Sequence, residues 1–185
     1  FRESVTFFFM PNAATFSSAS VALSDPRPSA ASVNYTFTGS SVTSTLIKCV
    51  KVVWSTTSTG TQAPTGFSAA SGTVTAASST LINSSASGWS LAKSDGTSST
   101  GQNNVYQYTN ATGVVPSTTT GATFILSSLT NHTTADTAYY FKVATYSNTN
   151  CSSGQIDNAT VEFINTDGST LSLTIDASLS FTVNA

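Results

Sequence analysis

Residues 46–54 have the sequence LIKCVKVVW, which is rich in β-branched residues and apolar at nearly every position. Only Lys48 and Lys51 interrupt the apolar run. A short run of this composition is typical of a strand that is covered on both faces of a sheet. We therefore expect residues 46–54 to form a central strand of a β-sheet protein.

The composition of the whole 185-residue chain also favours strands. Ser and Thr each occur 33 times, and the residues that favour helices are scarce. Thr, Val, Tyr and Phe, which suit a pleated surface, are plentiful. The 11 Phe, 6 Tyr and 2 Trp are spread along the chain and argue against disorder, because disordered segments lack aromatic residues.

Apolar and polar residues alternate with a period of two in several other segments, as in half-buried strands. These predicted strands cover residues 5–10, 33–37, 105–108, 123–129, 139–146, 161–164, 171–175 and 179–183. The pair Asp167-Gly168 favours a tight hairpin turn between the strands at 161–164 and 171–175. About nine to eleven short strands separated by turn signals predict an immunoglobulin-like or Greek-key β-sandwich. We expect a single sandwich domain over residues 13–185 and a separate extended strand over residues 1–12.

Cys49 and Cys151 are the two cysteines of the chain. In a chain rich in Ser and Thr and poor in charge, they suggest an oxidising compartment and one disulfide bond, with two free buried thiols as the alternative. The bond would close a loop of about 100 residues, for which the chain-entropy model gives a stabilisation of about 4–5 kcal/mol. A single His and the absence of a CxxC pair do not fit a zinc site.

Residues 136–140, Asp-Thr-Ala-Tyr-Tyr, resemble the Asp-x-Ala-x-Tyr corner of immunoglobulin-like domains. The resemblance implies that the Tyr140 hydroxyl bonds to nearby backbone and fixes a corner of the sandwich. It also implies that Cys49 and Trp54 share one central strand. The sequence departs from the family at Lys142, where the family has its second cysteine, so the strand order stays open.

Two further segments resemble a group of Ser- and Thr-rich surface proteins from ultrasmall candidate-phylum bacteria. They are residues 15–28 (TFSSASVALSDPRP) and 163–171 (FINTDGSTL), and the similarity extends over most of the chain after residue 13. The resemblance implies an exported wall or surface protein and says little about its activity.

Few residues suit catalysis or metal binding. His132 is the only histidine and lies in a polar segment, so we expect it in a surface loop rather than in an active site. Most of the Asp residues precede Gly or Pro or begin a strand, which are turn and cap positions. The chain has no Gly-x-Ser-x-Gly elbow and no Asp-rich calcium loop. The sequence therefore predicts neither an enzyme, nor a cofactor, nor a metal site.

Three lysines, Lys48, Lys51 and Lys142, fall in predicted strands. In wall-anchored pilins, a buried Lys beside an Asn and a carboxylate forms an isopeptide bond, and such a bond is one hypothesis for these lysines. The alternative is that their long side chains extend out of the sheet into solvent.

Six Asn-x-Ser/Thr sequences are candidate N-glycosylation sites. They begin at Asn34, Asn83, Asn110, Asn131, Asn150 and Asn158. With 12 Asn and 66 Ser and Thr in the chain, chance alone gives roughly four such sequences. The small excess permits glycosylation without indicating it.

Charge and hydropathy restrict the partners and the location. The net charge is −2 and the six Lys and Arg do not cluster, which does not fit nucleic-acid binding. No apolar run approaches the ~20 residues of a membrane span. Because the chain starts at Phe, we expect a processed protein whose signal peptide has been removed, located outside the cell or on its surface.

The N-terminal strand is the feature with the most direct bearing on function. Its apolar residues are candidates for an assembly strand, Val5, Phe7, Phe8, Phe9 and Met10, and Pro11 ends it. An unpaired apolar strand is an aggregation hazard, so it is expected to pair with a sheet of its own chain or of a neighbouring copy. Strand addition to a neighbour builds fibres in other systems.

We therefore expect a structural subunit of an extracellular filament, pilus or surface layer, which polymerises with copies of itself by donor-strand exchange. The alternative is an adhesin or carbohydrate-binding sandwich that recognises glycans on a host or neighbouring cell. That alternative needs exposed aromatic platforms. Trp89, Tyr106 and Tyr108 are the candidates for such platforms, although each of these residue types is more often part of a core than of a platform.

Overall fold

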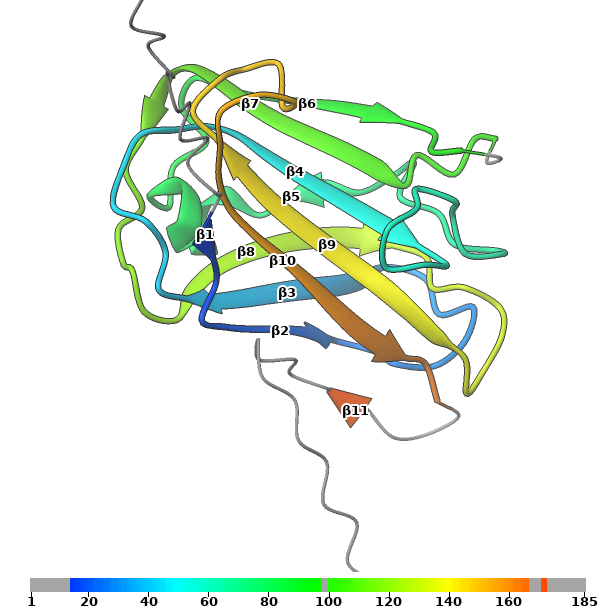
Figure 1. Cartoon of the computed structure of the whole chain (residues 1–185). Coiled ribbons are helices and arrows are strands. Elements are labelled where there is room, and N and C mark those ends of the chain that lie inside the picture. Colours follow the sequence, from blue (N-terminus) through cyan, green and yellow to red (C-terminus); the bar gives the residue numbers. More distant parts are fainter. Residues whose placement is uncertain (1–13, 98–99, 167–170, 173–185) are drawn as a thin grey trace, which may run out of the picture.

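The computed structural model describes residues 14–97, 100–166 and 171–172, which form two antiparallel β-sheets packed face to face (Figure 1). The strands are β1 (Ala14–Thr15), β2 (Ser18–Leu23), β3 (Val33–Ser40), β4 (Ile47–Ser55), β5 (Thr73–Val74), β6 (Trp89–Ser94), β7 (Val105–Val114), β8 (Ala122–Leu129), β9 (Ala138–Tyr146), β10 (Gln155–Ile164) and β11 (Leu171–Ser172). Two short 3-10 helices, η1 (Ala76–Ser78) and η2 (Thr80–Ile82), lie between β5 and β6. The predicted all-β sandwich is confirmed.

The larger sheet has the order β1-β10-β9-β4-β7-β6, with β11 paired to the end of β10. The smaller sheet has the order β2-β3-β8-β5. All pairings are antiparallel except that of β1, which runs parallel to β10. The predicted strand at residues 46–54 corresponds to β4, which lies between β9 and β7 in the middle of the larger sheet.

The strand order follows the immunoglobulin-type Greek key with one addition. Strands β2, β3, β8 and β5 stand in the order A-B-E-D of such domains, and β10, β9 and β4 stand in the order G-F-C. The hairpin β6–β7 enters between the D and E equivalents and extends the larger sheet beyond β4. Variable-type immunoglobulin domains extend the same sheet, but with strands that directly follow C.

Not every strand was predicted from the sequence. The strands β1 and β5 were missed because each spans only two residues, and β2 (SASVAL) and β6 (WSLAKS) were missed because Ser and Ala fill at least half of their positions. The predicted hairpin is confirmed where Ile164 pairs with Leu171 and Phe163 with Ser172. Its Asp167-Gly168 turn, the predicted strand at 179–183 and the N-terminal strand at 1–12 lie outside the described residues.

The core is organised around the ring of Tyr35, which is fully buried on β3. Its centroid lies 6.0 Å from that of Trp54, 6.2 Å from that of Phe141 and 5.7 Å from that of Phe163. These three rings come from β4, β9 and β10, so the smaller sheet is joined to the larger one by aromatic contacts. Such edge and stacked pairs add to the free energy gained by burying their surface.

The hydroxyl group of Tyr35 fixes a neighbouring loop. It donates a hydrogen bond of 2.7 Å to Oδ1 of Asn131. The Nδ2 group of Asn131 in turn donates to the backbone carbonyls of Asp25 and Arg27, both at 2.8 Å. These bonds hold the β2–β3 and β8–β9 loops together at one end of the sandwich, and they satisfy the buried polar atoms of Asn131.

The predicted disulfide bond between Cys49 and Cys151 is confirmed, with the two Cα atoms 5.6 Å apart. It joins the start of β4 to the β9–β10 loop, whereas immunoglobulin domains link strands B and F across the sandwich. Both cysteines are fully buried and pack with Tyr146 in a small cluster separate from the main core. The bond therefore reinforces one end of the larger sheet.

We predict that replacing both Cys49 and Cys151 with Ala lowers the free energy of unfolding by roughly 2–5 kcal/mol, because the unfolded chain loses a loop constraint. Urea denaturation of the oxidised original protein and of the double Ala variant measures this difference. Unchanged stability in the double variant would show that neither the disulfide bond nor the packing of its sulfur atoms contributes to stability.

Candidate functional site

The described chain begins at an edge of the larger sheet. Ala14 and Thr15 of β1 pair with Asp157 and Asn158 of β10, and the backbone N–H of Phe16 donates to the carbonyl of Asn158 at 3.2 Å. The candidate assembly residues lie outside the described part of the chain: Val5, Phe7, Phe8, Phe9 and Met10. The structure therefore shows only that Ala14 and Thr15, which follow the predicted assembly strand, lie at a sheet edge.

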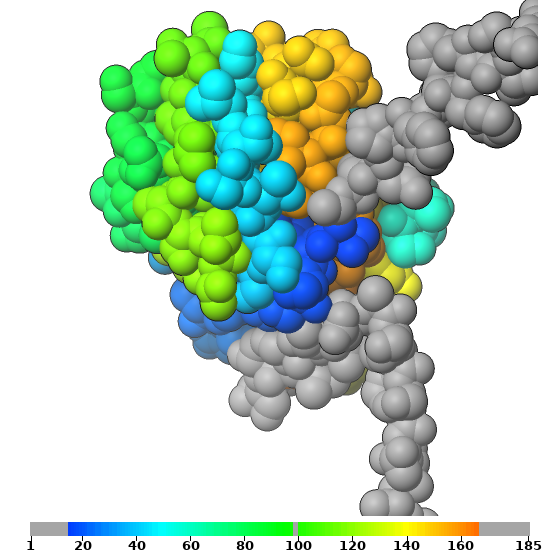
Figure 2. All heavy atoms as spheres, turned by 60° about the vertical axis from the view of Figure 1, so that its left-hand side comes forward, coloured from blue at the N-terminus to red at the C-terminus, as the bar shows by residue number. Residues whose placement is uncertain are grey.

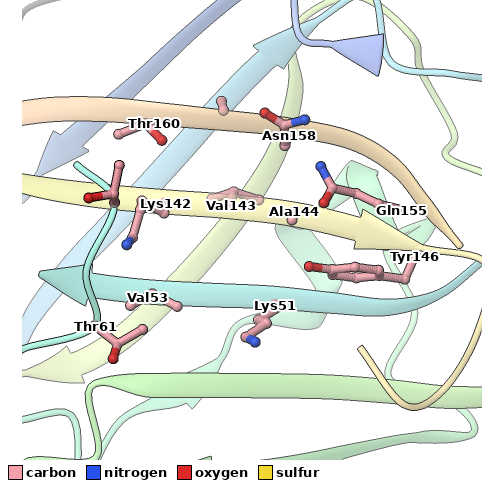
Figure 3. A pocket seen from close by; sticks show the side chains of 12 residues that line it. Lys51, Val53, Thr61, Lys142, Val143, Ala144, Tyr146, Gln155, Asn158 and Thr160 are labelled. Atoms are coloured by element: carbon pink, nitrogen blue, oxygen red, sulfur yellow. The ribbon is translucent and has the colours of Figure 1, made fainter. Parts of the chain in front are cut away.

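A groove of about 360 Å³ lies on the outer face of the larger sheet (Figure 3). Its lining comes from β4, β9, β10 and the loop after β4. The lining residues are Lys51, Val53, Thr59, Thr61, Lys142, Val143, Ala144, Tyr146, Gln155, Asn158, Ala159 and Thr160. Volumes of about 300–1,000 Å³ are usual for small-molecule sites.

The groove follows from the strand register. Ala144 of β9 pairs with Lys51 of β4 on one side and with Asn158 of β10 on the other. Directly paired residues project from the same face of a sheet, so a short Ala side chain stands between two long ones. In the neighbouring set of paired residues on this face, the long Lys142 side chain lies in the middle, between Val53 and Thr160. The hollow therefore forms where Ala144 leaves space between longer side chains.

Two lysines give the groove its charge. The Nζ group of Lys142 donates a hydrogen bond to the carbonyl of Gly60, which fixes this ammonium group against the loop after β4. Burial lowers the pKa of Lys142, and the positive charge of Lys51 lowers it further. The lining contains no Asp or Glu, and neither lysine forms a salt bridge within the described residues. The two ammonium groups therefore repel each other without a protein carboxylate to offset them.

The sequence identified the two lysines but not their site. Lys51 and Lys142 are candidates for an isopeptide bond, which needs an adjacent carboxylate in an apolar environment. The described lining of the groove contains Lys51, Lys142 and Asn158 but no carboxylate. The third lysine, Lys48, is half-buried on β4 outside the groove. Gln155, Thr59 and Thr61 were missed because only the folded strand order brings them together.

His132 was predicted in a surface loop, and this prediction is wrong. Its side chain is fully buried, with its ring centroid 3.7 Å from that of Tyr139 and 6.0 Å from that of Phe163. Neither ring nitrogen has a hydrogen-bond partner of good geometry among the described residues. Burial lowers the pKa of His132 to about 4, and the backbone of Thr134 and the side chain of Asn165 oppose this only in part. A polar sequence context did not prevent burial because the ring packs between two aromatic residues.

The described residues contain no group of three or more His, Cys, Asp or Glu that could hold a metal ion. The buried carboxylate, Asp157, accepts hydrogen bonds from the backbone N–H and the hydroxyl of Thr43 at 2.9 and 2.7 Å. These bonds join the β3–β4 loop to β10, which is a structural role. Asp157 and His132 are therefore engaged in packing rather than arranged around a reacting group.

The candidate aromatic platforms belong to the core. Trp89 is 9% exposed and stacks on Tyr108 with ring centroids 4.9 Å apart. Tyr106 is 1% exposed and its hydroxyl donates to the carbonyl of Ala69. These residues occupy inward positions of β6 and β7, so a sugar cannot stack on them without opening the sandwich.

Tyr140 does not form the predicted tyrosine corner. The inward positions of β9 are Tyr139, Phe141 and Val143, which places Tyr140 on the outer face of the sheet. Its hydroxyl makes no hydrogen bond to any other described residue. The segment is apolar on both faces, so alternation alone does not show which tyrosine is buried. Tyr139 is buried in the core, and Tyr140 therefore faces the side opposite to the one that the immunoglobulin motif implies.

The six candidate glycosylation sites differ in exposure. Asn34, Asn83 and Asn150 are exposed, and Asn158 is half-buried in the groove. Asn110 is 4% exposed and its Oδ1 accepts the backbone N–H groups of Thr112 and Gly113, both at 3.0 Å. Asn131 is fully buried in the network of Tyr35. The last two cannot carry a glycan in the folded protein and are structural residues.

No family model matches this chain, and no curated protein or solved structure shows significant similarity to it. Within the described residues, no helix has the length and apolar character needed to cross a membrane. The function is therefore argued from the geometry of the sandwich and of its outer face.

We predict that the protein loses up to about 3 kcal/mol of stability between pH 6.5 and pH 4 through His132. Its pKa is lowered on folding, so the unfolded chain takes up the proton first as the pH falls. The stabilising contribution is complete above pH 6.5 and is lost as the pH approaches 4. Urea denaturation across this range measures it, with His132→Phe as the control. Equal slopes in both proteins would contradict the prediction, because the chain has no other histidine.

Proposed function

We propose that this chain is a structural subunit of an extracellular filament or surface layer, and that residues 1–12 of one copy add a strand to the sheet of the next. The observation that carries the proposal is the position of β1. Ala14, the first described residue, lies in β1 at one edge of the larger sheet, and a sheet can be extended at such an edge.

The opposite edge of the same sheet is the acceptor we propose. This edge is β6, and no described strand pairs with its outer side. In Figure 2, the green chain around β6 lies at one side of the molecule, with the lime and cyan segments between it and the dark-blue start of the described chain. If residues 1–12 of one copy pair with β6 of the next copy, the two copies make a head-to-tail contact. Repeated contacts of this kind produce an open filament when the rotation between successive copies does not close a ring.

The backbone of β6 presents hydrogen-bonding groups to this outer side. The N–H of Trp89 donates to the carbonyl of Ala86 and not to its partner Asn110 on β7. In an antiparallel pair the direction of the backbone groups alternates. The backbone groups of Leu91 and Lys93 therefore point away from β7, where a new strand can bind them.

The charge that would normally protect this edge is turned inward. Lys93 is the only charged residue of β6, and its Nζ group donates to the carbonyl of Ala70 at 2.7 Å. The same ammonium group lies 5.4 Å from the ring centroid of Tyr106. Exposed edge strands are commonly guarded by lysines that point into solvent. The edge of β6 lacks that protection, which favours its pairing with another strand.

We predict that a chain starting at Asn12 stays monomeric under conditions in which the full chain forms fibres. The truncated chain keeps every residue of the described core and should retain the melting temperature of the monomer. Light scattering and electron microscopy of the two chains test this. Fibres formed equally by the truncated chain would rule out residues 1–12 as the donor strand.

We predict that Lys93→Pro blocks assembly whereas Lys93→Ala permits it. Proline removes the outward-pointing N–H without breaking a hydrogen bond to β7, and edge strands tolerate such a substitution. Alanine removes the ammonium contacts but keeps the N–H. Sedimentation of both variants, with circular dichroism to confirm their fold, separates the backbone effect from the side-chain effect. If the two assemble equally well, β6 is not the acceptor.

A glycan-binding surface module is the second candidate function, and the groove on the outer face is the observation that favours it. The burial of Trp89, Tyr106 and Tyr108 removes the aromatic platforms from this alternative. Recognition would therefore depend on charge and hydrogen bonding in the groove. A module of this kind binds its ligand as a monomer, which distinguishes it from a filament subunit.

A further inference from the structure

We propose that the groove beside Lys51 and Lys142 binds a carboxylated sugar, with the carboxylate between the two ammonium groups and the sugar hydroxyls on the polar lining. The inference does not depend on polymerisation, because the described lining of the groove includes no residue of the proposed acceptor strand β6.

Within the described residues, the two lysines of the site have no carboxylate in the groove lining and form no salt bridge. Lys51 and Lys142 belong to the adjacent strands β4 and β9. The pairs that contain them, Lys51–Ala144 and Val53–Lys142, follow each other on one face of the sheet. Figure 3 shows both side chains on the same side of the ribbon, together with Thr61 and Tyr146. A bound carboxylate would relieve the repulsion between the ammonium groups and accept charge-assisted hydrogen bonds from both.

The ammonium groups are available to a ligand. Lys142 donates one hydrogen bond to the carbonyl of Gly60, and an ammonium group has three N–H donors, so N–H groups remain for a ligand. Lys51 is half-buried, and its Nζ group makes no hydrogen bond to another described residue. The bond to Gly60 also holds Lys142 in place, so less conformational freedom is lost when a ligand binds.

The rest of the lining suits a ligand that carries several hydroxyl groups. Thr59, Gln155 and Thr160 are exposed, and their side chains make no hydrogen bond to other described residues. They offer both donors and acceptors around the charged centre. The aromatic residue of the lining, Tyr146, is only 8% exposed, so stacking contributes little. This combination favours an acidic sugar over a neutral sugar or an apolar ligand.

The floor of the groove sets its size. Ala144 stands between Lys51 and Asn158 on the outer face of the sheet. A volume of about 360 Å³ lies at the low end of the range for ligand pockets. The groove therefore accommodates one sugar unit with its carboxylate, while the remainder of a longer chain would extend over the sheet.

The test is equilibrium dialysis of the full-length oxidised chain against glucuronic acid, glucose and sodium sulfate, each probe used separately. Dialysis reports binding by monomers and polymers alike. We expect glucuronic acid to bind, glucose to bind at least about tenfold more weakly, and the affinity for glucuronic acid to fall as salt is added. Equal binding of glucose would overturn the role of the carboxylate. Sulfate binding as tight as that of glucuronic acid would overturn the role of the sugar.

Three variants locate the site. Lys51→Gln should raise the dissociation constant for glucuronic acid by about tenfold, because a charge-assisted contact is lost. Ala144→Leu should abolish binding by filling the floor while leaving the charge unchanged. Lys48→Gln is the matched control, because it removes the same charge from the same strand outside the groove. Equal losses in Lys48→Gln and Lys51→Gln would show that net charge, and not the groove, attracts the anion.

Discussion

The packing of Tyr35 holds the two sheets in one arrangement. Its ring lies on β3 of the smaller sheet and contacts aromatic rings from three strands of the larger sheet. Burial raises the pKa of its hydroxyl, which therefore remains a neutral donor to Asn131 at any pH in which the protein is studied. Because one side chain fixes both the distance between the sheets and the position of the adjoining loops, the phase of every neighbouring strand follows from it.

The sequence was sufficient for strands with large apolar residues at alternate positions, and insufficient elsewhere. Val33, Tyr35 and Phe37 mark β3 clearly, because nothing but a half-buried strand places them on one side. Where a segment is apolar on both faces, alternation cannot show which side is buried. Tyr139 and Tyr140 are such neighbours, and packing buried the first. The polar sequence around His132 likewise gave the wrong prediction of an exposed side chain. The ring is buried because its contacts with Tyr139 and Phe163 outweigh the polarity of the neighbouring residues.

The groove could not be derived from the sequence, because it depends on which strands are neighbours. Lys51 and Lys142 were each recognisable as lysines within apolar strands, yet their shared charge arises only when β4 lies beside β9. The hollow between them also depends on register, since a shift of one residue would replace Ala144 at that position with a residue of the other face. Strand order and register are long-range properties, and a single sequence specifies them only through the whole core.

The low charge of the chain connects the sheet edges with the groove. Only 8% of the residues are charged, so few side chains keep copies apart or screen a local field. On β6 the one lysine is bound to the protein itself, which leaves the backbone of that edge accessible. In the groove, two of the six basic residues lie together without a carboxylate in the lining. In the two proposals, a surface with few charges would direct strand pairing to the edge at β6 and the attraction of anions to the groove.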